Sequence, residues 1–354
     1  MPRRPILAIA LSMGVLAAVE VLLRAVVPAE ILVFSYEKPN GMLLLDAGSG
    51  TYLPRPLAED VVPDGPNHWR YRMNAAGLRE DAEIPPATPV GTRRWLALGD
   101  SWIWGQSADQ GANLEANLEA VLPTRGYGPV EVINAGVPGA GAYDMLVRWQ
   151  DLRARWEVDG VLLGAPKNVG RQRDVAAERA LWYRGGGAPY VDLYLYLGLR
   201  RLLVPLTRGH LRTLDADVWS TILADTTALV REARGAGLEV VVGLWPSDRH
   251  AAMSSDPGVP YATFAAALTP LGASVTGARL ASNACWGFED VSHPSEAGYR
   301  VLAEIVADRM VGGPDPGMLR TTPRCEDVPG FGPTKAGNAR SKAEAWAGRP
   351  TPPG

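Results

Sequence analysis

Short apolar stretches alternate with longer segments of helical periodicity through the middle of this chain. Each apolar stretch runs directly into glycine, asparagine or a Trp-Pro pair, which is typical of buried strands that end in turns. The longer segments between them have the length and apolar spacing of helices that bury one face. The pattern predicts strands at 95–98, 130–133, 161–163 and 238–244, and helices at 113–122, 143–156, 217–234 and 295–310.

This alternation predicts an α/β fold of three layers, α/β/α, in which helices cover both faces of a central parallel sheet. Ligand sites of such sheets lie at the carboxyl ends of the strands. Ser101, Gly139 and Asn168 each come shortly after a predicted strand. These three residues therefore lie where the fold is expected to place its chemistry.

The N-terminus carries a long apolar run after Arg3 and Arg4. The run covers about 22 residues, or roughly 33 Å as a helix, which is enough to cross a bilayer. The two arginines favour a cytoplasmic N-terminus, and Glu20 and Arg24 are spaced to pair on one helix face near the outer interface. The alternative is a signal peptide whose apolar region ends near 17–18. A third alternative is a buried helix of a soluble protein. Either of the first two interpretations places the rest of the chain outside the cytoplasm.

The chain divides into four predicted segments. Residues 1–29 are the transmembrane anchor or signal peptide, and the Pro- and Gly-rich residues 30–92 are a lead-in segment that we expect to pack on the main domain. Residues 93–312 form that domain, and the tail 313–354 is predicted to be disordered. An aromatic-rich insertion at 174–214 is interpreted as a helix packed on the domain, with a lid or membrane-facing flap over the site as the alternative.

Composition and charge narrow the picture further. A hydrophobic content of 47% supports a substantial core, and a net charge of −3 gives no reason to expect a nucleic acid partner. Cys285 and Cys325 lack the spacing of metal ligands. In an exported chain these two cysteines are able to form a disulfide, and two unpaired thiols are the alternative.

Polar residues with catalytic chemistry occur in a fixed order along the domain. A Gly-Asp-Ser block ends at Ser101, an Asn-x-Gly-x-x-Gly block ends at Gly139, Asn168 follows the third strand, and an Asp-x-x-His block runs from Asp290 to His293. A serine hydroxyl needs a base to take its proton and an acid to orient that base. A glycine N–H and an asparagine amide are able to donate hydrogen bonds to an oxyanion. The set predicts a serine esterase.

The order and local sequence of these blocks resemble the SGNH hydrolase family, also called the GDSL esterases. The resemblance implies that Ser101 is the nucleophile, His293 the general base and Asp290 the acid that orients it. It also implies an oxyanion hole made by the backbone N–H groups of Ser101 and Gly139 with the side chain of Asn168. A flavodoxin-like α/β/α fold and a reaction without cofactor or metal are implied as well.

The resemblance covers 93–310, and within the lead-in segment 71–79 resembles a stretch upstream of the nucleophile in membrane-anchored bacterial members. One block departs from the family pattern, because Pro166 and Val169 stand where the family has glycine and aspartate. Proline lacks an N–H, and the valine side chain accepts no hydrogen bond.

Three functions are compatible with these residues. The first is hydrolysis of an acyl ester through an acyl-enzyme. The second is O-acylation of a cell-envelope polysaccharide by the same triad, and the third is an inactive carbohydrate-binding or scaffold module. The expected partners are an acyl-ester or acylated glycan substrate and, through the N-terminal helix, a membrane.

Export of the domain is open to a direct test. Alkaline phosphatase, which folds only in an oxidising compartment, is fused after His293 in a bacterial host and should be active there. A cytoplasmic reporter fused at the same point should be inactive. The reverse pattern would contradict the predicted topology.

Overall fold

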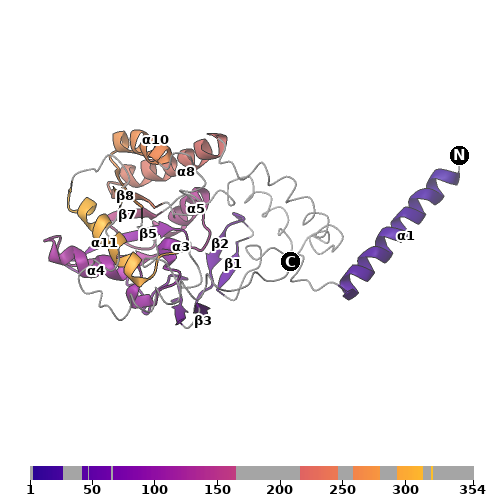
Figure 1. The fold of residues 1–354 in the computed structure, drawn as a ribbon, viewed down its shortest axis with the longest axis horizontal. Helices are drawn as coiled ribbons and strands as arrows, with labels where there is room; N and C mark the ends of the chain where they lie inside the picture. The colour runs from indigo at the N-terminus through magenta and orange to yellow at the C-terminus, as the bar shows by residue number, and fades with distance from the viewer. Residues whose placement is uncertain are drawn as a thin grey trace.

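The computed structural model describes residues 3–26, 42–46, 48–64, 67–164, 216–245, 258–279, 293–313 and 320–321. Helices lie on both faces of one parallel sheet, so the predicted three-layer α/β/α fold is confirmed (Figure 1). The elements are α1 (Arg3–Val26), β1 (Leu43–Leu45), β2 (Tyr52–Pro54), β3 (Glu59–Asp64), β4 (Asn67–Arg72), β5 (Arg93–Gly99), α3 (Ser101–Trp104), η1 (Gln110–Ala112), α4 (Leu114–Thr124), β6 (Val130–Asn134), α5 (Ala142–Leu152), β7 (Gly160–Gly164), α8 (Ala216–Gly235), β8 (Glu239–Leu244), α10 (Gly258–Leu268), η3 (Thr269–Leu271), β9 (Ser274–Arg279), α11 (Glu296–Met310) and β10 (Arg320–Thr321).

The sheet has the strand order β10-β9-β8-β7-β5-β6, and every pair of neighbours runs parallel. The chain builds β6 on one side of β5 and then crosses to build β7 on the other side. The carboxyl end of β5 is therefore the point where the strand order reverses, and open α/β sheets bind ligands in the crevice at such a point. Ser101 begins α3 immediately after this end of β5.

Alternate residues of the central strands pack into two separate hydrophobic cores, one on each face of the sheet. Trp95 and Ala97 of β5 pack with α4 and α11, whereas Leu96 and Leu98 pack with α5 and α8 on the other face. All four side chains are buried. Burying one large apolar side chain contributes about 1.5–3 kcal/mol. The strands are therefore held from both sides, which fixes the end of β5.

Each strand and helix predicted from periodicity is present, with shifts at the ends. α5 ends at Leu152 instead of 156, because the Trp156 indole donates to the Ile84 carbonyl at 3.1 Å and belongs to a turn against the lead-in segment. Among the elements missed within the predicted domain are α10 and β9. α10 begins with glycine and contains an early proline, and β9 contains only one large apolar residue, Val275, so neither shows a strong pattern.

The described part of the lead-in segment forms two antiparallel hairpins, β1–β2 and β3–β4. Tyr71 and Met73 are buried with Trp104 of α3 in one apolar cluster. The lead-in segment therefore contacts the helix that begins with Ser101.

The N-terminal run forms the helix α1, but the predicted transmembrane anchor is not supported. Among the residues that the structure describes, no helix is both long and apolar enough to cross a membrane. In Figure 1 the helix stands apart from the α/β body.

Several predictions from the sequence concern residues outside the described ranges. These include the insertion at 174–214, both cysteines and most of the tail 313–354. Within the tail, Arg320 and Thr321 form β10 and pair with β9, so this short stretch is ordered at the sheet edge.

Candidate active site

Ser101 and His293 lie side by side although 192 positions separate them in the sequence. The His293 Nε2 atom is 2.6 Å from the Ser101 Oγ atom, within hydrogen-bonding distance. Ser101 is 8% exposed, and His293 is partly buried. The fold thus brings together a hydroxyl and an imidazole in the arrangement that activates a serine nucleophile.

The position of Ser101 follows from the junction between β5 and α3. Asp100 has an extended backbone and caps the helix, since its carboxylate accepts the Trp102 N–H at 2.9 Å. The short helix then folds back over the strand end, where a Cβ on Gly99 would overlap the Ile103 side chain. A residue without a side chain is therefore required at position 99, and the Ser101 side chain is carried to the sheet edge.

The position of His293 follows from the start of α11. Ser295 is the N-cap of this helix, and its hydroxyl accepts the Gly298 N–H at 3.3 Å, a role that serine commonly takes at a helix start. The buried Tyr299 hydroxyl donates to the Gln106 carbonyl at 2.9 Å, in the loop that follows α3. This bond ties the helix after His293 to the loop after Ser101.

Asn134 is a site residue that sequence reasoning missed. Its side-chain amide donates to the Ile103 carbonyl at 2.8 Å and to the Glu115 Oε2 atom at 3.0 Å, and its Oδ1 atom accepts the Gly136 N–H at 3.0 Å. The residue thereby joins the end of β6 to the underside of α3. The available signal was its place as the first residue of the Asn-x-Gly-x-x-Gly block.

The remaining predicted site residues divide into one that the structure describes and two that it does not. Gly139 lies in the loop between β6 and α5 with a φ of +73°, a conformation that favours glycine. Asn168 and Asp290 fall outside the described residues, so their predicted roles stay predictions. Among the described residues, no group of three His, Cys, Asp or Glu side chains is arranged to hold a metal ion.

Glu80, Glu115 and Glu119 lie near Asn134, and burial raises the pKa of each carboxyl. The Glu80 carboxyl accepts the Asn134 backbone N–H at 2.7 Å, and its burial raises the pKa to about 8. Burial also raises the pKa of Glu115 well above its ordinary value and raises that of Glu119. At neutral pH Glu80 is therefore mostly protonated, which limits the repulsion between these neighbouring carboxyls.

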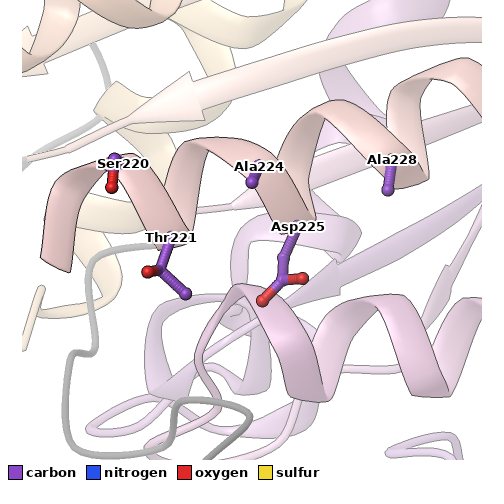
Figure 2. A pocket seen from close by; sticks show the side chains of 5 residues that line it. All are labelled: Ser220, Thr221, Ala224, Asp225 and Ala228. Carbon is purple, nitrogen blue, oxygen red and sulfur yellow. The ribbon is translucent and has the colours of Figure 1, made fainter. Parts of the chain in front are cut away.

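A hollow of about 400 Å³ lies elsewhere, on α8 (Figure 2). Figure 2 shows that the side chains lining it all come from this helix, and they include neither Ser101 nor His293. The hollow is therefore not part of the candidate active site.

The chain matches no protein-family model and no curated protein. It is similar to several solved structures. A mutant of Axe2, an acetyl-xylooligosaccharide esterase from Geobacillus Stearmophilus, is 16% identical with a TM-score of 0.42 and covers 64% of this chain and 98% of its own. TesA is 18% identical with a TM-score of 0.38, covering 62% and 98%.

The psychrotrophic esterase EstA from Pseudoalteromonas sp. is 15% identical with a TM-score of 0.35, covering 62% of this chain and 94% of its own. At these identities and TM-scores the likenesses assign neither activity nor substrate to this chain. Its function has to be inferred from its own site.

Glu80 gives a pH-dependent stability that can be measured. The folded chain keeps a proton on Glu80 up to about pH 8, whereas the unfolded chain loses it near the ordinary value of 4.5. The wild-type free energy of unfolding should therefore fall, relative to Glu80→Gln, as pH rises between these values. The difference should change by at most about 1.4 kcal/mol per pH unit.

Urea unfolding of both proteins at several pH values between about 5 and 8 measures this difference. Glutamine retains an acceptor oxygen for the Asn134 N–H, so the comparison isolates the proton. Two parallel stability curves would contradict the raised pKa.

Proposed function

We propose that this protein is a serine acyl hydrolase that cleaves an ester through an acyl-enzyme. The observation that carries the proposal is the 2.6 Å contact between the His293 Nε2 and Ser101 Oγ atoms at the reversal point of the sheet. The resemblance of the sequence blocks to the SGNH hydrolases supports the same chemistry. The proposal applies to a small carbonyl ester that reaches the carboxyl end of β5.

Acylation begins when the Ser101 Oγ atom attacks the ester carbonyl while its proton passes to His293 Nε2. For this transfer the imidazole carries its own proton on Nδ1, and Asp290 is proposed to accept that hydrogen bond and hold the ring. The tetrahedral intermediate then collapses, the carbon–oxygen bond to the alcohol breaks, and His293 returns its proton to the leaving oxygen. Ser101 is left acylated.

Deacylation repeats these steps with water as the nucleophile, and releases the acid and free Ser101. In both halves negative charge develops on the former carbonyl oxygen. The backbone N–H groups of Ser101 and Gly139 and the Asn168 amide are the proposed donors to it. Loss of a donor of this kind typically costs about 10²–10³ in kcat.

The polysaccharide O-acyltransferase alternative uses the same acyl-enzyme, and a sugar hydroxyl replaces water in the second half. The difference is measurable in one assay, because adding a soluble glycan acceptor would divert the acyl group from acid to acylated sugar. The inactive alternative predicts neither product.

Substitution of Ser101 and His293 tests the proposal. Ser101→Ala and His293→Ala should each lower the turnover of a short-chain aryl ester at least about 10³-fold, because each removes one half of the nucleophile–base pair. A fluorophosphonate probe should label the wild type at Ser101, as located by peptide mapping, and should not label Ser101→Ala.

Two matched variants control for general effects of the substitutions. Ser220→Ala and His68→Ala change an exposed serine on α8 and an exposed histidine on β4, and both should hydrolyse the ester at the wild-type rate. Circular dichroism and melting temperature establish that all four variants are folded. A folded Ser101→Ala protein with wild-type turnover would refute the assignment.

A further inference from the structure

Arg79 places a buried guanidinium against the loop that follows Ser101. The side chain comes from the lead-in segment and is 1% exposed. Its Nη1 atom donates to the carbonyls of Trp104 and Gly105, the latter at 2.7 Å, and its Nη2 atom donates to the Ala108 carbonyl at 2.7 Å. One side chain thus binds three carbonyls over five consecutive residues, beginning at the last residue of α3.

A tight turn in the lead-in segment aims this side chain. The Asn74 Oδ1 atom accepts the N–H groups of Ala76 and Leu78, both at 3.0 Å. Gly77 has a φ of +68° and packs against the Pro54 backbone, so the turn holds one conformation. The Arg79 N–H then donates to the Asn134 carbonyl at 3.2 Å, which fixes the start of the side chain beside β6.

The loop that Arg79 binds has an unfavourable backbone conformation. Ser107 has a φ of +65° although it is not glycine, and it is 3% exposed. Such a conformation persists only where the surroundings hold it. The Tyr71 hydroxyl accepts the Ser107 N–H at 3.2 Å, and the Arg79 guanidinium stacks on the Tyr71 ring at 4.5 Å from its centroid. The lead-in segment therefore supplies two of the side chains that hold this loop, and the Tyr299 hydroxyl on the Gln106 carbonyl is a third.

A burial this complete is costly for a charged group. It lowers the pKa of Arg79, while the facing groups Tyr71, Tyr299, Glu115 and Asp109 favour the charged form. The hydrogen bonds that Arg79 makes at the end of α3 compensate for this cost. α3 is a single turn of helix, and its final carbonyls have no partner further along the helix. A lysine ammonium is a point charge and cannot reproduce the planar fork that binds several carbonyls.

We propose that Arg79 is a positioning residue for the nucleophile, holding the Ser101 helix in register with His293 through the backbone of residues 104–108. Since Ser101 is a nucleophile only under the proposed function, the catalytic consequence rests on that proposal. The claim that Arg79 holds the loop does not depend on that proposal, and hydrogen exchange measures it directly.

Arg94 provides a matched comparison within the same fold. It too is buried and binds carbonyls of the lead-in segment, those of Pro85, Pro86 and Ala87, at 2.9–3.2 Å. It lies near the start of β5, at the opposite end of the strand from Ser101. Replacing the Arg94 guanidinium should therefore lower the stability of the fold without changing the position of Ser101.

The experiment compares Arg79→Lys and Arg94→Lys in the full chain. Hydrogen exchange should accelerate over residues 101–108 in Arg79→Lys and stay at the wild-type rate there in Arg94→Lys, because exchange follows local opening. For the aryl ester, kcat and the rate of fluorophosphonate labelling should fall about 10²-fold in Arg79→Lys, the order expected for a misplaced reacting group. KM should change less than twofold, and Arg94→Lys should retain the wild-type kcat per folded molecule.

Equal exchange over 101–108 in the two variants would overturn the inference. So would a wild-type kcat in Arg79→Lys, or a kcat that falls in both variants in step with their melting temperatures. If the wild type neither hydrolyses esters nor labels at Ser101, the failure belongs to the proposed function, and the exchange data alone decide whether Arg79 holds the loop.

A milder variant covers the case in which Arg79→Lys does not fold. Tyr71→Phe keeps the ring beneath the guanidinium and removes the hydroxyl that accepts the Ser107 N–H. Tyr71→Phe should resemble Arg79→Lys with smaller effects: faster hydrogen exchange over 101–108 and a several-fold lower kcat at unchanged KM. Wild-type exchange in Tyr71→Phe would count against the inference.

Discussion

The close packing of α3 onto the carboxyl end of β5 is the constraint on which the candidate site depends. The strand is buried from both faces, so its end has little freedom to move. Gly99 lets the single turn of helix approach the strand, Asp100 caps it, and Asn134 binds it from the neighbouring strand. Ser101 inherits its position from these contacts, and the contact with His293 is possible only because that position is fixed.

A helix of one turn has no internal stability of its own, because nucleation is unfavourable and few hydrogen bonds repay it. Its termini here are held by side chains that lie outside the helix. The Asp100 side chain satisfies an N–H at the first end, and the Arg79 guanidinium satisfies carbonyls at the second. The lead-in segment is therefore built into the structure around Ser101, and is more than a connection to the N-terminal helix.

The buried polar groups below the site are satisfied mainly by one another and by backbone. Glu80 and Glu115 bind the backbone and side chain of Asn134 respectively, and burial raises the pKa of both carboxyls. A protonated carboxyl avoids most of the cost of burying a charge. The Arg79 guanidinium binds the Ala108 carbonyl in this region. The Tyr299 hydroxyl, from the helix that follows His293, binds the Gln106 carbonyl of the same loop. The two halves of the Ser101–His293 pair therefore share one set of supports.

The sequence alone predicted the layered fold and named Ser101 and His293 as a candidate pair, and the structure places these two side chains in contact. Buried strands are continuous apolar runs and surface helices are amphipathic, so a short stretch of sequence is enough to recognise either. A strand such as β9 has too few large apolar residues to be recognised in this way. The N-terminal run formed a helix, and no helix of the described residues is long and apolar enough to cross a membrane. Only the tertiary structure decided that Arg79, Tyr71 and Asn134 meet at α3, since hydrogen bonds between distant segments leave no periodic trace. The strand order placed them there, and that order is set by packing of the whole sheet.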